Sequence, residues 1–254
     1  MEKKYKLTDE TININGITLY RIEALKDFSN VKKGDKGGFV ESENNLSHDG
    51  DCWVYNNAKV YGNANIFDNA KIYNSARVFG NSFIFNNAKV YRYAKISGKA
   101  KVFNNAKVDD NAEIFGNATV FNNVKVGGST KVYDNAILYD DAAVYGNSLI
   151  FEHAGVFGNA NVYNNAQVYG DAKVFSNAQV YGDSKVYGNA EVRDKARVYG
   201  KTEIYGNATI YGNTRVYNNV KVFDNARVFG NTRLFGDTEL CGNARLCGFI
   251  KFKI

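Results

Sequence analysis

The sequence predicts an all-β fold: a parallel β-helix of about 11 triangular coils, preceded by a small N-terminal β cap. Three observations lead to this prediction. From Val54 to Gly248 the chain repeats a six-residue unit of the form Val-Tyr-Gly-Asn-Ala-Lys with no break in phase. All 33 first positions of these units are Val, Ile or Leu. The fifth position, which begins at Ala58, is always Ala, Ser, Thr or Val except for Ile250 in the last unit.

Each unit is expected to form one short strand and one corner. Side chains alternate across a strand, so the fifth position of one unit and the first position of the next point to the same side, which is the core. The third and fourth positions are nearly all Gly, Asn, Asp or Ser, which tolerate the positive φ of a corner. Three corners close a triangle of 18 residues, so the coils would stack into a prism roughly 50 Å long.

This aliphatic-x-x-x-small-x repeat resembles that of the bacterial hexapeptide-repeat family, over about three quarters of the chain. The resemblance implies a left-handed parallel β-helix. Crossovers between parallel strands are right-handed as a general rule, so a right-handed solenoid is the alternative.

Residues 1–53 form a leader ahead of the repeats. Thr11 to Tyr20 reads as two alternating strands that meet at Asn15-Gly16, which predicts a β-hairpin. An open solenoid end exposes apolar side chains and strand edges, so the leader is expected to cap it. The predicted domains are therefore a cap (1–53), the repeat solenoid (54–248) and a C-terminal capping strand (249–254), whose lysines discourage edge pairing.

The leader also resembles that of the YdcK-type hexapeptide proteins. The resemblance rests on Phe-Ser-Asn-Val-Lys-Lys-Gly-Asp-Lys-Gly-Gly-Phe-Val (28–40), Asn-Leu-Ser (45–47) and Gly-Asp-Cys-Trp-Val-Tyr (50–55). Those proteins are described as transferases by inheritance from the wider family, so the resemblance implies a transferase name but little mechanism.

Composition narrows the functional classes. The chain has no Pro, as a hydrogen-bonded parallel ladder requires, and its first residues contain no apolar run, so we expect neither a signal peptide nor a membrane span and a cytoplasmic location. Cys52, Cys241 and Cys247 show no metal-ligand spacing and are expected to be free thiols, with no metal and no cofactor.

The second position of each unit faces outward and is Tyr or Phe in 27 of 33 units. At 18-residue intervals these aromatics should form three ladders. The expected members are Tyr145, Tyr163, Tyr181, Tyr199 and Tyr217 on one face; Phe151, Tyr169, Tyr187 and Tyr205 on the second; and Phe67, Phe85, Phe103 and Phe121 on the third. Stacked rings stabilise a β-ladder, and exposed aromatic surface also indicates a macromolecular partner.

The sixth position is often Lys or Arg, which accounts for the net charge of +6. Basic residues interleaved with aromatics can hold single-stranded nucleic acid, although acidic residues interrupt any continuous basic stripe. The alternative is that the lysine stems simply pack over the rings with their charges in water.

The pattern breaks where the units Tyr91-Arg92-Tyr93, Asp109-Asp110-Asn111 and Gly127-Gly128-Ser129 should stack on one corner. A recess there would hold an arginine, two carboxylates and bare backbone, with Ser97 and Lys99 on the next corner. Tyr91, Arg92, Tyr93, Asp109, Asp110 and Ser129 are the candidate binding residues; plain drift of the repeat is the alternative.

Two further breaks carry hypotheses. The sixth positions Ile137, Ala143, Leu149 and Gly155 lose their polar side chains and form an uncharged belt, a candidate protein contact together with Tyr145, Tyr163 and Tyr181. His153, the one histidine in the repeats, follows Glu152. The family resemblance implies a histidine general base acting with acyl-coenzyme A, so these two are the candidate catalytic residues.

The first functional hypothesis is a non-enzymatic rigid solenoid that presents its aromatic ladders to a macromolecular partner, expected to be a protein in a bacterial or phage setting. The alternatives are an acyl- or acetyltransferase using acyl-coenzyme A, and a single-stranded nucleic-acid-binding protein. The ladders occupy all three faces about equally, so a monomer or weak dimer is expected rather than the family's trimer.

Overall fold

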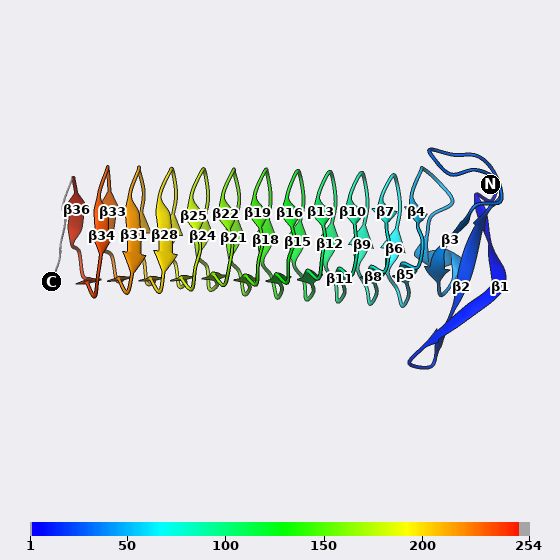
Figure 1. Ribbon diagram of the computed structural model, residues 1–254, viewed down its shortest axis with the longest axis horizontal. Coiled ribbons are helices and arrows are strands. Elements are labelled where there is room, and N and C mark those ends of the chain that lie inside the picture. The colour runs from blue at the N-terminus through cyan, green and yellow to red at the C-terminus, as the bar shows by residue number, and fades with distance from the viewer. Residues whose placement is uncertain (1, 249–254) are drawn as a thin grey trace. The chain divides into compact units, whose positions relative to one another are not determined.

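The computed structural model describes residues 2–248, which fall into two compact units: an N-terminal unit up to Asn123 and a C-terminal unit from Val124. Each unit is a stack of parallel coils (Figure 1). Apart from the short 3₁₀ turn η1 (Glu43–Asn45), every regular element among the described residues is a β-strand. The predicted all-β parallel solenoid is confirmed, its handedness stays a prediction, and the predicted strand over 249–254 lies outside the described residues.

The N-terminal unit begins with the cap. Strands β1 (Tyr5–Ile14) and β2 (Ile17–Ala24) form an antiparallel hairpin whose turn residues Asn15 and Gly16 both have positive φ, as a type I′ turn requires. Strand β3 (Lys36–Val40) pairs antiparallel with β2 and parallel with β5 of the first coil. The cap sheet therefore runs directly into one face of the solenoid.

Twelve short strands follow in this unit, in three parallel sheets. The first sheet continues from β3 through β5 (Lys59–Val60), β8 (Arg77–Val78), β11 (Lys95–Ile96) and β14 (Glu113–Ile114). The second contains β4 (Trp53–Val54), β7 (Lys71–Ile72), β10 (Lys89–Val90) and β13 (Lys107–Val108). The third contains β6 (Asn65–Ile66), β9 (Phe83–Ile84), β12 (Lys101–Val102) and β15 (Thr119–Val120).

The C-terminal unit repeats the same arrangement. Its first sheet contains β17 (Lys131–Val132), β20 (Leu149–Ile150), β23 (Gln167–Val168), β26 (Lys185–Val186), β29 (Glu203–Ile204), β32 (Lys221–Val222) and β35 (Glu239–Leu240). The second contains β16 (Lys125–Val126), β19 (Ala143–Val144), β22 (Asn161–Val162), β25 (Gln179–Val180), β28 (Arg197–Gly200), β31 (Arg215–Asn218) and β34 (Arg233–Phe235). The third contains β18 (Ile137–Leu138), β21 (Gly155–Val156), β24 (Lys173–Val174), β27 (Glu191–Val192), β30 (Thr209–Ile210), β33 (Arg227–Phe229) and β36 (Arg245–Cys247).

The core of each unit consists of the first and fifth repeat positions, as predicted. Val168 and Ala172, for example, are fully buried. Where the fifth position is Ser or Thr, its hydroxyl donates a hydrogen bond to the carbonyl three residues earlier, as Ser148 does to Tyr145 at 2.7 Å. This hydrogen bond offsets the cost of removing the hydroxyl from water, which explains why Ser and Thr can replace Ala there.

The residue at the third position of each six-residue unit has positive φ, from Asn56 in the first unit to Gly248 in the last. Gly, Asn and Asp reach this left-handed region most easily, and they occupy nearly all of these sites. Arg92 (φ 52°), Glu152 (φ 57°) and Ser176 (φ 60°) adopt the same conformation without that advantage. The left-handed residue turns the chain through each corner, so it fixes where one strand ends and the next begins.

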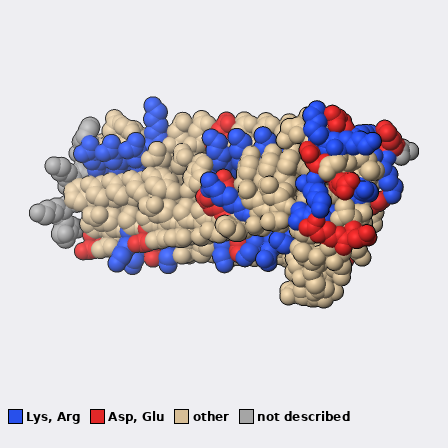
Figure 2. Space-filling model, turned by 45° about the vertical axis from the view of Figure 1, so that its right-hand side comes forward, with Lys and Arg blue, Asp and Glu red and all other residues tan. Residues whose placement is uncertain are grey.

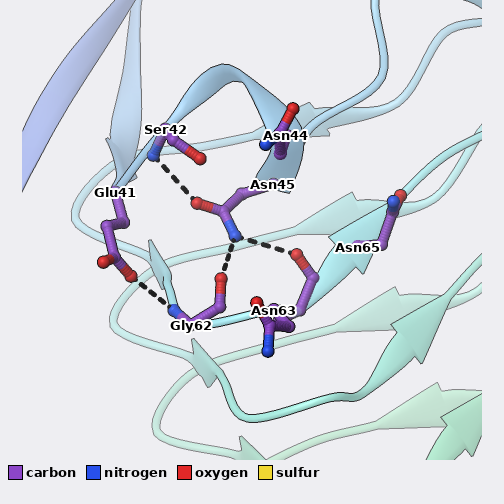
Figure 3. A pocket seen from close by; sticks show the side chains of 8 residues that line it. Glu41, Ser42, Asn44, Asn45, Gly62, Asn63 and Asn65 are labelled. Atoms are coloured by element: carbon purple, nitrogen blue, oxygen red, sulfur yellow. Dashed lines mark hydrogen bonds between the residues drawn. The ribbon is translucent and has the colours of Figure 1, made fainter.

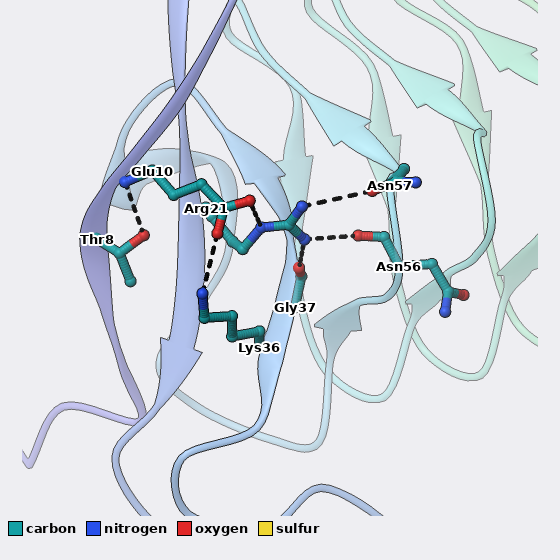
Figure 4. Close-up of polar contacts among 7 residues, drawn as sticks. All are labelled: Thr8, Glu10, Arg21, Lys36, Gly37, Asn56 and Asn57. Atoms are coloured by element: carbon teal, nitrogen blue, oxygen red, sulfur yellow. Dashed lines mark hydrogen bonds and ion pairs between the residues drawn. The ribbon is translucent and has the colours of Figure 1, made fainter.

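Arg21 of β2 ties the cap to the first coil (Figure 4). Its guanidinium donates to the Gly37 carbonyl at 2.7 Å and to the Asn56 carbonyl at 3.1 Å, and its Nε donates to Glu10 at 2.6 Å. The same group lies 4.2 Å from the centre of the Phe39 ring. One side chain therefore joins all three cap strands, β1, β2 and β3, to the first corner of the solenoid.

Ala172→Leu tests the assignment of the narrow core. Three extra carbons have no free space at a fully buried site, so we expect a loss of about 1–3 kcal/mol in the free energy of unfolding. Thermal melting measures it, with the outward-facing Lys173→Leu as the control. A variant that melts within about 2 degrees of the parent would show that Ala172 does not face the core.

Arg21→Met tests the tie between cap and coil. It removes the hydrogen bonds to two backbone carbonyls, so we expect the free energy of unfolding to fall by about 2 kcal/mol in urea titration. Lys36→Met is the matched control. It removes the second cation that pairs with Glu10, at an exposed position, so its loss of stability should be much smaller. Equal losses in the two variants would mean that only the pairing with Glu10 matters.

Candidate functional surface

The outward aromatics form stacked ladders within each unit. The rings of Tyr199 and Tyr217 lie 4.9 Å apart with an interplanar angle of 0°, and those of Phe85 and Phe103 lie 4.7 Å apart at 5°. In such a stack each ring is covered on both faces by its neighbours. The ladders therefore present ring edges and tyrosine hydroxyls to solvent rather than free ring faces.

The predicted ladders are present in both units. In the C-terminal unit, stacking runs from Tyr163 through Tyr181, Tyr199 and Tyr217 to Phe235, and on a second face from Tyr133 through Phe151, Tyr169, Tyr187 and Tyr205 to Phe223. In the N-terminal unit, Phe67, Phe85, Phe103 and Phe121 form the predicted stack. Tyr145, at the start of its predicted ladder, is 40% exposed.

Arg193 occupies an aromatic position that sequence reasoning overlooked. Its guanidinium lies 4.5 Å from the centre of the Tyr211 ring, one coil further along. Arginine stacks on an aromatic face much as another ring would, so it continues the column with a charged group. The signal for it was present, because Arg193 is one of only six second positions that are not aromatic.

The corners carry a second set of ladders, which the sequence analysis did not predict. Asparagines at the fourth position donate side-chain hydrogen bonds to the residue 18 positions on, as Asn69 does to Asn87 and Asn189 to Asn207, both at 3.2 Å. Third-position carboxylates accept from the backbone N–H of the next coil, as Asp194 does from Gly212 at 2.9 Å. These bonds explain why Asn and Asp, and not only Gly, recur at the corners.

The predicted binding cluster is partly assembled in the N-terminal unit. Arg92 forms ion pairs with Asp110 and Asp109, the latter at 3.5 Å, so the arginine and both carboxylates meet as expected. The hydrogen bond to Asp110 raises the pKa of Arg92. Tyr91 stacks on Tyr73 at 4.9 Å, while Tyr93 is 64% exposed. The single guanidinium is thus shared by two carboxylates, and the three side chains keep a net negative charge.

A shallow hollow of about 500 Å³ adjoins this cluster. It is lined by Asn56, Asn57, Asn74, Ser75, Arg92 and Tyr93. Ser97 and Lys99 lie one corner further along the same unit, where the Lys99 N–H donates to the Gly116 carbonyl at 2.7 Å. Ser129 belongs to the C-terminal unit, where it is exposed and its N–H donates to the Gly146 carbonyl at 2.6 Å.

His153 and Glu152 are adjacent on a corner of the C-terminal unit but make different contacts. The Glu152 carboxylate accepts a hydrogen bond from the Gly170 N–H at 2.8 Å. The His153 ring lies 3.3 Å from the Asn135 amide and 4.0 Å from Asp171. Among the contacts of the described residues, the carboxylate that lies beside the His153 ring is therefore that of Asp171 and not that of Glu152. Their predicted catalytic role stays a prediction.

The uncharged belt wraps around the C-terminal unit instead of forming one patch. Ile137 pairs in register with Gly155 on one sheet, whereas Ala143 and Leu149 lie on the other two. Ile137 is 43% exposed, and Leu149 is half-buried. A flat partner could therefore contact only part of the belt at once.

A polar hollow of about 320 Å³ lies where the cap meets the first coils (Figure 3). The Asn45 amide donates to the carbonyls of Gly62 and Ala64 at 2.8 and 2.9 Å, and it accepts from the Ser42 N–H. Glu41 accepts from the Gly62 N–H at 2.6 Å. These polar groups already satisfy one another, which favours a structural role for the hollow.

The cap also contains a buried lysine that sequence reasoning missed. Lys4 Nζ donates to the carbonyls of Cys52 and Gly50 at 2.9 and 3.1 Å and lies 3.3 Å from Cys52 Sγ. Burial lowers the pKa of Lys4 and raises the pKa of the Cys52 thiol. The three carbonyl contacts of Nζ, with Asp49 as the third at 3.4 Å, indicate a structural fastening of the chain before the first coil.

Grouped metal-ligating side chains and long apolar helices are both absent from residues 2–248. Across residues 2–248, no three His, Cys, Asp or Glu side chains are grouped so that they could hold a metal ion. No helix in that range has the length and apolar character needed to cross a membrane. Cys241 and Cys247 are exposed free thiols.

Arg92→Asn tests whether the arginine is held there against a conformational cost. Asn tolerates positive φ better, and the exposed pairs with Asp109 and Asp110 contribute little, so the variant should melt at a higher temperature than the parent. Thermal melting checks this, with Asn74→Arg on the same corner as the reverse change. A lower melting temperature for Arg92→Asn would show that the ion pairs outweigh the backbone strain.

Comparison with known proteins agrees with this architecture. A family model for the YdcK β-solenoid repeat matches residues 204–219. A protein of Escherichia coli (strain K12) named "Uncharacterized acetyltransferase YdcK" is 33% identical over 79 residues, which is 28% of this chain and 24% of that relative. The matching segment thus spans about a quarter of the relative's length. The hexapeptide period and the parallel solenoid are thus accompanied by a local likeness to the YdcK β-solenoid repeat.

Proposed function

We propose that this chain is a non-enzymatic binding solenoid that presents its outer faces to a macromolecular partner. The observation that carries the proposal is the ladder structure: rigid rows of half-buried aromatic side chains run along the faces of both units, with their edges toward solvent. Tyr side chains supply large contact area at low conformational cost, and they are enriched in protein interfaces. A protein partner fits this surface best.

The regularity of the coils supports the same proposal. The family resemblance implies acyltransferases in which loops interrupt the coil and wall a site, and the repeat of this chain has no inserted residue from Val54 to Gly248. The corner hollows are lined by turn residues that already pair with their neighbours, such as Asn45 with Gly62. An acyl-coenzyme A chain would find few unpaired polar groups there.

Acetyl transfer is the second candidate, favoured by two observations. The E. coli relative carries an acetyltransferase name, and His153 is exposed with a carboxylate, Asp171, at 4.0 Å. A carboxylate at that distance can orient a histidine general base. The pairing of Glu152 with Gly170 leaves Asp171 as the better candidate for that role.

Base stacking by a single-stranded nucleic acid requires free ring faces. The ring faces inside these ladders are occupied by neighbouring rings. The geometry therefore favours a partner that contacts ring edges and hydroxyls. We further propose that the chain acts as a monomer or weak dimer, because no single face is richer in aromatics than the others.

Calorimetric titration with acetyl-coenzyme A separates the two candidates. We expect no saturable heat, because the described corner hollows offer few free polar groups. Saturable micromolar binding that His153→Gln abolishes, with Gln167→Ala as a surface control, would overturn the proposal in favour of acetyl transfer. Light scattering adds a second readout: a stable trimer at micromolar concentration would also favour the transferase.

A further inference from the structure

One outward face of the C-terminal unit carries three arginines in register. Arg197 of β28 pairs with Arg215 of β31, which pairs with Arg233 of β34. Adjacent strands lie about 4.8 Å apart, so the three guanidinium groups form a closely spaced row. Figure 2 shows Lys and Arg side chains in such a row near the C-terminal end, with almost no acidic side chains beside it.

In this row no carboxylate alternates with the arginines, whereas acidic and basic residues alternate at the same repeat position of the neighbouring sheet. On that sheet Lys185, Glu203, Lys221 and Glu239 are in register and alternate in sign, and Lys221 pairs with Glu239 at 2.9 Å. Among the described residues, the three arginines form no ion pair with a carboxylate. Like charges on directly opposed strand positions repel, so the row is destabilising unless an anion covers it.

An aromatic row flanks the arginines on the same face. Arg197 and Tyr199 are two residues apart in one strand and so point to the same side, as do Arg215 and Tyr217. Tyr181, Tyr199 and Tyr217 stack at 4.8 and 4.9 Å. Strands β28 and β31 pair over four residues, against two for most strands of the solenoid, so this part of the face is especially regular.

A hollow of about 510 Å³ lies on the corner beyond the tyrosine row. Its lining residues are Gly182, Asp183, Gly200, Lys201, Asn218, Asn219, Gly236 and Asp237. Lys201 is exposed there, and the two carboxylates of the lining, Asp183 and Asp237, each accept a hydrogen bond from an asparagine side chain. Glycine at three of the lining positions leaves backbone accessible next to the ring edges, so a polymer chain could lie close to the surface.

We propose that this arginine face, formed by Arg197, Arg215, Arg233, Tyr181, Tyr199 and Tyr217, binds an acidic polypeptide segment of a protein partner. The inference rests on the proposed binding function and assigns it a location and a chemistry. Guanidinium groups bind carboxylates through paired hydrogen bonds, and Arg and Tyr are among the residues enriched at the centres of protein interfaces. Stacking covers the ring faces, which disfavours nucleic-acid bases as the occupant.

The row in the other unit is less suited to this role. Lys71, Lys89 and Lys107 are also in register, but Lys71 Nζ is held by Ser29 and Asn30 of the cap. Lysine is also a point charge that does not form the paired hydrogen bonds of arginine. The arginine face therefore offers the stronger site for carboxylates.

Fluorescence anisotropy with labelled poly-L-glutamate tests the proposal at low ionic strength. The parent should bind saturably, and binding should weaken as salt is added. The triple variant Arg197→Gln, Arg215→Gln and Arg233→Gln should bind at least about tenfold more weakly, because it loses three charge-assisted contacts. Lys173→Gln, Lys185→Gln and Arg227→Gln on the other two sheets remove the same charge and should leave most of the binding.

Arg215→Glu separates loss of binding from loss of folding. It restores the alternation of charge seen on the neighbouring sheet, so its melting temperature should equal or exceed that of the parent while poly-L-glutamate binding falls. Equal weakening by the two triple variants, or undiminished binding by Arg215→Glu, would overturn the arginine face as the site.

The identity of the occupant is tested by an unlabelled dT oligonucleotide as competitor. Tighter binding of the oligonucleotide than of poly-L-glutamate, with the same dependence on the three arginines, would overturn the acidic-polypeptide assignment in favour of nucleic acid. Absence of binding to either polymer would reject the anionic partner. That result would leave the outcome of the acetyl-coenzyme A titration, and with it the broader binding proposal, untouched.

Discussion

The left-handed backbone conformation at the third position of each six-residue unit is the constraint on which the rest of this structure depends. It turns the chain at a fixed interval of six residues, so that each residue lies beside its equivalent 18 positions on. Any change of period would shift the fifth and first positions out of the core, where a branched aliphatic and a small residue fill a narrow space. The corner therefore determines both the strand register and the core packing of each unit.

Because like residues stack, the chemistry of a face is a property of a column rather than of a single side chain. Tyrosines stack on tyrosines, asparagines donate to asparagines, and carboxylates accept from the next corner. The same rule places like charges side by side where the sequence does not alternate them. A column in which charges alternate stabilises itself, whereas a column of like charges needs a partner. The two differ only in the charges of the residues at 18-residue intervals.

Much of the fold follows from the sequence because its period is local and unbroken. The core positions, the corners, the outward ladders and the hairpin at Asn15-Gly16 were all predicted from spacing. The handedness of the solenoid could not be predicted from spacing, because a left-handed and a right-handed solenoid would bury the same residues. The hydrogen bonds of Lys4 and Arg21 were also missed, since they join residues from 11 to 48 positions apart that no periodicity relates.

The candidate sites were less accessible from sequence for a physical reason. Spacing brought Arg92 together with Asp109 and Asp110, but it could not show that one guanidinium pairs with both carboxylates. It placed Glu152 beside His153 in the chain, whereas the left-handed corner directs the carboxylate to Gly170. The alternation of charge on one sheet and its absence on the next became visible only when the strands were arranged into columns.

The single tryptophan of the chain gives the cap a spectroscopic label of its own. Trp53 is 1% exposed and packs edge-on against Tyr5 and Phe28, so its emission reports the cap and the first strand. The tyrosine columns of the C-terminal unit contain no tryptophan, and their parallel rings should give coupled near-ultraviolet circular dichroism. In repeat proteins, separate groups of repeats can unfold in separate steps. Melting of the cap and of the C-terminal coils can thus be followed as two signals from one unlabelled sample.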